Sequence, residues 1–444
     1  DRTGAIGPGL AESWSISEDG KEYVFKLRQG VKFHDGEPFD ASVVKFSLDR
    51  LFAPDSTVPA KSLYTDIEKV EVVDPSTVKV TLKSPNSFML YSLSLGDAGI
   101  MHPKSAATND KNPIGTGPFM FKERKEGDSI TLVSSPTYRD PSAIKLNTVI
   151  FKIVKDPSAQ VSALLAGDVD AFPGFQAPEL VERLRKDSRF VVVVGTTEGE
   201  VILATNNGKK PFDNPKVRQA IAHAIDRDEL ISAESGFGTP IGSHFAPHNK
   251  AYVDLTKTYP FDIAKAKALL AEAGYPNGFE FEWTTSQNES WGLPIVEAVI
   301  PMLAKVGIKA KPKLVEVTVL TELLMKGEHQ TLIASSLTGP DSLATLRCYY
   351  SKTPRTACNY TGFSNPAFDK LLDDAAQEGD MAKREELLKK ANNLLYEEAP
   401  VWFFNYNKAV LAYQPWVHGL QANPTEITHQ YPEDIWVDAK SPAK

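Results

Sequence analysis

The sequence predicts an α/β protein built from more than one domain. Its 444 residues exceed the length at which a single hydrophobic core usually stops growing. Hydrophobic residues make up 42% of the chain and charged residues 24%, as in ordinary globular proteins. Strand patterns dominate the residues before about Gly115, and strand and helix patterns alternate after it.

The N-terminal part of the chain predicts a meander of short strands followed by a helix. Tyr23, Phe25 and Leu27 stand at every second position, so they fall on one face of a strand bounded by turn residues. Asp40 is expected to cap the N-terminus of the next helix. The apolar residues of that helix are Val43, Val44, Phe46 and Leu48.

A turn at residues 112–119, NPIGTGPF, separates this part from the elements that follow. It lacks the lysine and the following helix of a phosphate-binding loop, so a structural turn is predicted. The predicted elements after it are strand Val149–Val154, a helix through Val161, Leu164 and Leu165, a short helix Glu179–Leu184, strand Phe190–Val194 and strand Val201–Ala204.

Four later helices are predicted from their N-terminal residues. Asn214 precedes Pro215, and proline is well suited to the first position of a helix. Asp226, Asp262 and Asp380 occupy the capping position of the other three.

The charge and hydropathy patterns argue against two classes of partner. The net charge is −8 and the chain has no long run of Lys and Arg, so no nucleic-acid partner is expected. No apolar run approaches the roughly 20 residues that span a bilayer. The chain opens on Asp1-Arg2-Thr3 without a signal peptide, and we expect that such a segment has been removed.

The only two cysteines, Cys348 and Cys358, lie close together in a polar, turn-prone stretch. They are either two free thiols or a local disulfide that closes a short loop. The disulfide is the favoured alternative, and it would place the protein in an oxidising compartment.

A metal-dependent hydrolase is the main competing function. His244 and His248 are four residues apart, a spacing that places two ligands on one face of a helix. However, Pro247 lies between them and no glutamate is present there as a general base, so loop histidines are favoured. His34 lies at a turn and is expected to be structural. The sequence therefore predicts no catalytic residue, no metal site and no cofactor.

Several longer segments together carry a resemblance to a known family. They are LAESW, DGKEYVFKLRQGVKFHDG, NPIGTGPF, PFDNPKVRQAIAHAIDRDEL, YPFDIAKAKALLAEAGYPNGF and APVWFFN. In this order they resemble the oligopeptide/dipeptide/nickel family of ABC-transporter periplasmic solute-binding proteins (family 5, cluster C). The resemblance covers nearly the whole chain from Gly9 onward.

The resemblance implies the two-lobed α/β fold of type II periplasmic binding proteins with an extra strand-rich subdomain. Residues 1–115 would form the extra subdomain of lobe one, residues 116–196 and 413–444 the rest of lobe one, and residues 197–412 lobe two. Hinge strands are expected near Gly195–Glu198 and Asn407–Tyr413. Relatives carry a further N-terminal segment, so the chain is expected to begin late, without one strand and part of the ligand pocket.

The resemblance also implies a receptor and not an enzyme. We expect the protein to capture a small peptide-like, opine-like or amide solute between its lobes. It would deliver the solute to an ABC permease in the inner membrane and work in the periplasm as a monomer. Some dipeptide-binding relatives hold a disulfide in the neighbourhood of Cys348 and Cys358, which supports that pairing. An oligosaccharide ligand is the alternative within the family, and a secreted metal-dependent hydrolase is the alternative outside it.

The ligand-contacting residues are expected in two loops where the chain departs from peptide-binding relatives. Those relatives hold a dipeptide's ammonium with an aspartate after a Trp-Thr-Gly-type turn, and its carboxylate with an arginine. Here the turn reads Ser335–Pro340, and Asp341 aligns better with a structural aspartate. The other loop, Thr284–Trp291, contains no arginine. Dipeptide binding through both termini is therefore doubtful.

Neutral polar groups and an aromatic ring in these loops suit an uncharged, singly charged or sugar-like solute. The candidate residues are Ser335, Ser336 and Thr338 as hydroxyl partners, Gln287 and Asn288 as amide partners, Trp291 as a stacking wall, Asp341 as a cation partner or turn cap, and Trp402 as a pocket or core residue.

Overall fold

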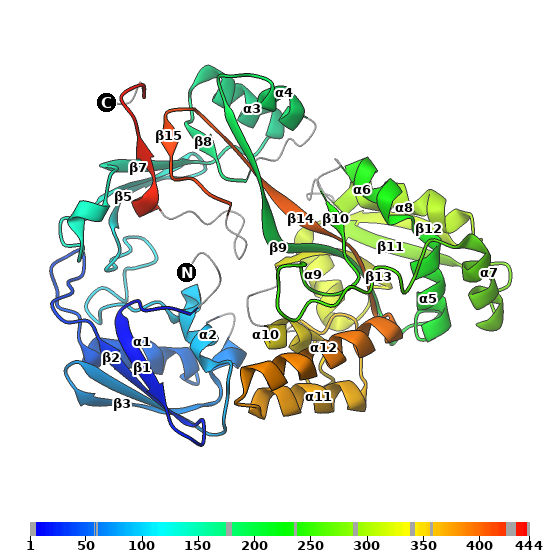
Figure 1. The fold of residues 1–444 in the computed structure, drawn as a ribbon, viewed down its shortest axis with the longest axis horizontal. Helices are drawn as coiled ribbons and strands as arrows, with labels where there is room; N and C mark the ends of the chain where they lie inside the picture. The colour runs from blue at the N-terminus through cyan, green and yellow to red at the C-terminus, as the bar shows by residue number, and fades with distance from the viewer. Residues whose placement is uncertain are drawn as a thin grey trace. The chain divides into compact units, whose positions relative to one another are not determined.

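The structure is a computed structural model that forms two compact units, each containing helices and strands (Figure 1). It describes residues 6–56, 58, 61–174, 180–234, 238–286, 292–337, 342–355, 358–422 and 432–441. Unit 1 comprises Asp1–Gly195, Ala409–Asn423 and Thr428–Lys444, and unit 2 comprises Thr196–Lys408 and Pro424–Ile427. The predicted α/β class is confirmed.

Unit 1 begins with an antiparallel sheet in the order β1-β2-β4-β3. The strands of this sheet are β1 (Ala11–Ile16), β2 (Glu22–Leu27), β3 (Ile67–Asp74) and β4 (Thr77–Leu82). Helix α1 (Ala41–Phe52) packs on β3 and β4. Tyr23 and Leu27 are buried, as their alternation predicts. Asp40 caps α1, because its carboxylate accepts from the N–H groups of Ser42 and Val43 at 2.8 and 3.2 Å.

His34 fixes the glycine-rich turn that follows this sheet. Its Nδ1 accepts from the N–H of Gly115 at 3.2 Å, so the other ring nitrogen carries the proton and donates to the carbonyl of Gly117 at 3.0 Å. The N–H of His34 in turn donates to the carbonyl of Gly115 at 2.9 Å. His34 is therefore a structural residue, as predicted.

The rest of unit 1 contains a second antiparallel sheet, in the order β5-β6-β7, and short helices. Its elements are η1 (Lys61–Tyr64), α2 (Met89–Ser94), η2 (Gly96–Ala98), β5 (Phe119–Lys125), β6 (Ser129–Ser134), η3 (Pro141–Ala143), β7 (Thr148–Lys152), α3 (Pro157–Ala166), β8 (Ala171–Phe172), α4 (Val181–Arg185), β15 (Val417–His418), η6 (Pro432–Asp434) and β16 (Trp436–Val437).

Unit 2 contains more helix than unit 1 and has one extensive hydrophobic core. Its helices are α5 (Pro215–Ala224), α6 (Arg227–Glu234), α7 (Ile263–Glu272), α8 (Gly292–Ala304), α9 (Val317–Lys326), α10 (Ser342–Leu346), η5 (Arg347–Tyr349), α11 (Pro366–Gln377) and α12 (Met381–Glu398). Its strands are β10 (Thr239–Pro240), the parallel pair β11 (Glu280–Ser286) and β12 (Lys309–Val315), and β13 (Thr331–Leu337). Across the described part of the chain, no helix has the length and apolar character needed to cross a membrane.

The four helix starts predicted in unit 2 are confirmed by side-chain hydrogen bonds. Asn214 caps α5, Asp226 caps α6, Asp262 caps α7 and Asp380 caps α12, each accepting from backbone N–H groups of the first turn. These groups have no partner inside the helix, so a short polar side chain at this position satisfies them.

The long strand β9 (Val191–Thr205) corrects the sequence analysis, which predicted two separate strands there. The chain passes from unit 1 to unit 2 inside β9, at Gly195, and returns inside β14 (Val401–Tyr413), at Lys408. The two strands are neighbours in the sheet order β10-β14-β9-β13. Gly195 is no turn residue: a Cβ built on it would lie 2.0 Å from the Cβ of Ala422, so close packing requires the glycine.

We expect Gly195→Ala to lower the free energy of unfolding by about 1–3 kcal/mol, because the added methyl group overlaps Ala422. Urea denaturation of the two proteins measures the difference. Gly117→Ala is the control, since a Cβ at Gly117 meets nothing within 4 Å. An unchanged midpoint for Gly195→Ala would show that the two segments do not pack this closely.

Candidate functional site

Most of the candidate ligand residues lie outside the part of the chain that the structure describes. Gln287, Asn288, Trp291, Thr338 and Asp341 belong to this group. The backbone of Ser335 and Ser336 lies in β13, but their side chains are not described. Trp402, Cys348 and Cys358 are described. The roles given to the eight candidate ligand residues therefore stay predictions.

The register of β13 shows which residue lies opposite the candidate serines. β13 pairs antiparallel with β9, with Ser335 opposite Val201 and Ser336 opposite Glu200. The backbone of Glu200 is therefore the direct partner of the backbone of Ser336 in this sheet.

A group of buried polar residues leads into the other candidate loop. Thr284, Thr285 and Ser286, at the carboxyl end of β11, are 3%, 2% and 0% exposed. β11 lies beside β13 (Figure 1), and the N–H of Glu282 donates to the side chain of Gln330, just before β13, at 2.9 Å. Ligands of α/β proteins bind at the carboxyl ends of strands, where loops supply polar groups.

The side chains of Glu200 and His244 are in contact with each other in the interior of unit 2. A carboxylate oxygen of Glu200 contacts Nδ1 of His244, and the two residues are 1% and 3% exposed. His244 comes from the buried segment after β10, and its N–H donates to Oδ1 of Asn392 on α12 at 3.5 Å. A carboxylate is expensive to bury unless it is paired and hydrogen-bonded, so the placement of Glu200 is a functional signal.

The sequence analysis considered His244 as a metal ligand, favoured a loop histidine instead, and did not single out Glu200. Within the described residues no group of three or more His, Cys, Asp and Glu side chains is placed to hold a metal ion. His248 is exposed, whereas His244 is buried against Glu200. One signal was present in the sequence: Glu200 is an acidic residue directly before the apolar run Val201–Ala204.

Tyr349 packs against this pair. Its ring lies edge-on to the imidazole of His244, with 5.2 Å between ring centroids, and the residue is 5% exposed. Burial, together with the negative charge of Glu200, raises the pKa of Tyr349 well above its usual value. The phenol therefore stays protonated and offers a hydrogen-bond donor.

Trp402 lies inside the core of unit 2, with 4% of its surface exposed. The guanidinium of Arg227 lies 4.2 Å from the ring centroid, and the rings of Tyr259 and Tyr396 pack beside it at 5.6 and 6.0 Å. Its indole N–H has no acceptor among the residues that the structure describes. Core packing accounts for the ring, and the ligand role of Trp402 stays a prediction.

Cys348 and Cys358 form the disulfide that the sequence analysis favoured over two free thiols. The bond joins residues ten apart in sequence, with 5.0 Å between the Cα atoms. It closes the loop that follows η5, whose last residue is Tyr349. The disulfide therefore holds the segment that carries Tyr349.

Arg355 anchors the same loop to the end of β9. Its guanidinium donates to the carbonyl of Tyr360 at 2.5 Å and to Oδ1 of Asn206 at 3.1 Å. A Cβ on Gly362 would lie 2.0 Å from this guanidinium, so only glycine leaves room for it. Asn206 also donates to the carbonyls of Gly327 and His329, both at 2.9 Å. One buried amide thus joins three segments.

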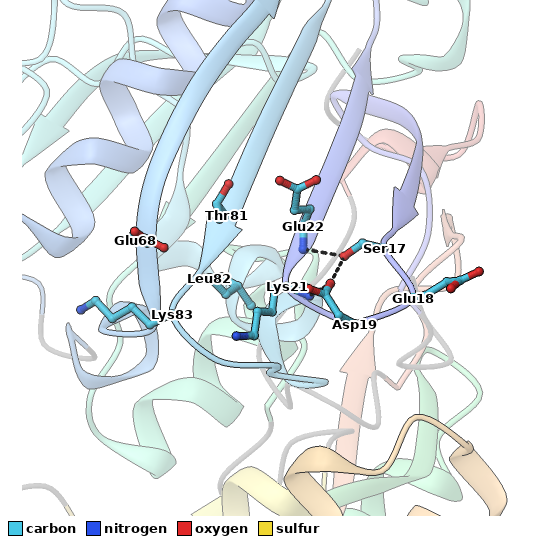
Figure 2. A pocket seen from close by; sticks show the side chains of 9 residues that line it. All are labelled: Ser17, Glu18, Asp19, Lys21, Glu22, Glu68, Thr81, Leu82 and Lys83. Carbon is cyan, nitrogen blue, oxygen red and sulfur yellow. Dashed lines mark hydrogen bonds between the residues drawn. The ribbon is translucent and has the colours of Figure 1, made fainter.

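A surface hollow in unit 1 lies beside the turn between β1 and β2 (Figure 2). The N–H of Glu22 donates to Oγ of Ser17 at 2.9 Å, and this hydroxyl donates to Asp19 at 2.6 Å. The other side chains that line the hollow are those of Glu18, Lys21, Glu68, Thr81, Leu82 and Lys83. Both acidic and basic groups line this open hollow, so it favours no single ligand chemistry. The hydrogen bonds stabilise the turn.

Comparison with known proteins places this geometry in context. Residues 5–357 match the family model of bacterial extracellular solute-binding proteins, family 5. The glutathione-binding protein GsiB of Escherichia coli strain K12 is 32% identical over 406 residues, which cover 88% of this chain and 78% of that protein.

Two solved structures have the same fold over almost the whole chain. One is the ABC transporter-associated periplasmic binding protein DppA from Helicobacter pylori in complex with the peptide STSA. It has a TM-score of 0.86 and 28% identity, and the match covers 97% of this chain and 89% of that one. The other is AgaA from A. tumefaciens R10 in complex with agropinic acid, with a TM-score of 0.85 and 30% identity over 99% of this chain and 91% of that one.

We expect replacement of both cysteines, Cys348→Ser with Cys358→Ser, to lower the free energy of unfolding by about 2–3 kcal/mol. The open loop has more conformational freedom in the unfolded chain. Thermal denaturation of the variant, the oxidised protein and the protein reduced with dithiothreitol measures the effect. The reduced protein is expected to match the variant, and equal stability of all three would show that the bond contributes nothing.

We also expect acid to destabilise the protein through His329. Burial, with the positive charges of Arg355 and Lys209, lowers the pKa of His329 from 6.5 to about 4. The unfolded chain therefore binds a proton in this pH range that the folded chain does not. The contribution of His329 to the free energy of unfolding is therefore complete above pH 6.5, and it falls by about 3 kcal/mol as the pH is lowered toward 4.

A series of urea denaturations between about pH 4 and 7.5, with His329→Gln as reference, tests this expectation. The wild-type protein should lose stability relative to the variant as the pH falls. A difference that stays constant with pH would mean that His329 titrates normally.

Proposed function

Because the chain belongs to family 5 of the bacterial extracellular solute-binding proteins, we propose that it is a periplasmic receptor for a small peptide-like, opine-like or amide solute. It captures the solute without covalent chemistry and passes it to an ABC permease of the inner membrane. It acts as a monomer, reaches the periplasm through a signal peptide, and has no nucleic-acid partner.

The observation that carries this proposal is the buried polar region of unit 2. Thr284, Thr285 and Ser286 are buried at the end of β11, and the Glu200–His244 pair is buried beside β13. Buried polar groups cost free energy unless they are hydrogen-bonded, so a protein collects them where they are used. The relatives support the chemistry: their names and structures record glutathione, the peptide STSA and agropinic acid as ligands.

The alternative outside the family, a secreted metal-dependent hydrolase, is less well supported. His244 is engaged with Glu200 in the interior, and His248 lies in an exposed segment. The two histidines therefore do not form the paired ligand set that their spacing suggested. Within the family, an oligosaccharide remains the second candidate because the two predicted loops contain Gln287, Asn288 and Trp291.

We expect one class of solute to raise the melting temperature of the protein in a panel containing glutathione, the peptides Met-Leu and STSA, agropinic acid and maltotriose. A ligand at a hundred times its Kd stabilises the folded state by about 2.7 kcal/mol. Protein refolded from denaturant, and so freed of co-purified solute, is used with isothermal titration calorimetry as the second measurement.

Stabilisation by maltotriose alone would support the oligosaccharide reading. Hydrolysis of a peptide that stops on addition of a chelator, with no stabilisation by any solute, would contradict the receptor function.

A further inference from the structure

The guanidinium of Arg355 lies in a slot that is bordered by glycines of unit 2. A Cβ built on Gly362 would lie 2.0 Å from a nitrogen of this guanidinium, and one built on Gly327 would lie 3.0 Å from another. Gly208 borders the slot at 3.6 Å. We call these three residues the glycine slot. They come from separate segments, after the disulfide-closed loop, after α9 and after β9, so distant parts of unit 2 make room for one side chain.

The partners of Arg355 in the glycine slot are neutral groups. Its guanidinium donates to the carbonyl of Tyr360 at 2.5 Å and to the amide oxygen of Asn206 at 3.1 Å. Burial lowers the pKa of Arg355, so the surroundings disfavour its positive charge. Keeping a charge in such a place costs free energy. The side chain therefore stays in the slot only if its own segment is held close to the slot.

The disulfide supplies part of that restraint. Before Arg355, the N–H of Ser351 donates to a carboxylate of α11 at 3.0 Å. After Arg355, the carbonyl of Thr361 accepts from the backbone just beyond β9 at 2.8 Å. The bond between Cys348 and Cys358 closes the loop between these two attachments. Breaking it gives the stretch around Arg355 more conformational freedom, which favours the solvated side chain.

A reductant can reach this bond, because Cys348 and Cys358 are both partly exposed. A dithiol such as dithiothreitol attacks one sulfur as the thiolate and forms a mixed disulfide, which its second thiol then resolves. The bond between the two cysteines breaks and each becomes a thiol. The dithiol gives up two electrons and two protons and is oxidised to its own cyclic disulfide.

We propose that the Cys348–Cys358 disulfide is a redox-sensitive switch that controls whether Arg355 occupies the glycine slot. In the oxidised protein the guanidinium ties the loop to Asn206 at the end of β9. In the reduced protein the guanidinium returns to water, and the stretch around it opens while the core of unit 2 stays folded. The switch needs no solute, so its test is independent of the proposed receptor function.

Limited proteolysis with trypsin tests the inference, because the specificity pocket of trypsin must take up a free Lys or Arg side chain. Mass spectrometry compares the rate of cleavage after Arg355 with the rate after Arg218, which is 6% exposed on α5 and reports unfolding of the core of unit 2. In the oxidised protein the two rates should be similar. In the protein reduced with dithiothreitol, cleavage after Arg355 should be roughly tenfold faster than after Arg218, since only a local opening is needed.

The double variant Cys348→Ser with Cys358→Ser should give the same ratio as the reduced protein, without any reductant. Similar rates at the two arginines in the reduced protein would show that reduction only lowers the overall stability, and would overturn the inference. The same excess of cleavage after Arg355 in the oxidised protein would overturn it as well, because the disulfide would then control nothing.

His329 provides a second measurement that a change in overall stability does not mimic. Burial sets the pKa of His329 at about 4, and the positive charges of Arg355 and Lys209 contribute to lowering it. Departure of Arg355 removes one of these charges, so the pKa of His329 should be higher in the reduced protein. Arg355→Gln removes the same charge from the oxidised protein and should also raise it. NMR titration of the imidazole measures both, and an equal pKa in oxidised and reduced wild-type protein would overturn the inference.

Discussion

The pairing of β9 with its neighbours is the constraint on which the rest of the structure depends. β9 lies between β14 and β13 in the sheet, and the chain passes from unit 1 to unit 2 inside β9 and returns to unit 1 inside β14. β9 and β14 are hydrogen-bonded neighbours in this sheet, so at these two passages the chain runs within a strand and not through a loop. The same strand fixes Glu200 opposite Ser336 and brings Asn206 to the anchor of the disulfide loop.

Local signals in the sequence predicted much of the fold. Helix caps such as Asp40 and Asn214 were predictable because a capping side chain bonds to N–H groups two or three residues away. The prediction of two separate strands in residues 190–204 was wrong because it also used local signals alone. Two glycines in that stretch indicate a break in the strand when only neighbouring residues are considered. Gly195 is instead required by close packing against Ala422, which lies far along the chain.

The candidate site was less predictable because its contacts join distant residues. Glu200 and His244 are 44 positions apart, and neither strand periodicity nor motif spacing connects them. Arg355 depends on Asn206 and on the missing side chain of Gly362, which also come from separate segments. The disulfide was predictable because its two cysteines stand close in sequence and have no competing partner. The loops at Gln287 and Thr338 stay predictions.

The place of β14 in the sequence has a consequence for how the protein is made. This strand is among the last parts of the chain, yet it lies between β10 and β9 in unit 2 and pairs with β8 of unit 1. The sheet β10-β14-β9-β13 is therefore incomplete until residue 413 has been synthesised, whereas the sheets β1-β2-β4-β3 and β5-β6-β7 of unit 1 are complete earlier. We expect this sheet to form only when about nine-tenths of the polypeptide exists.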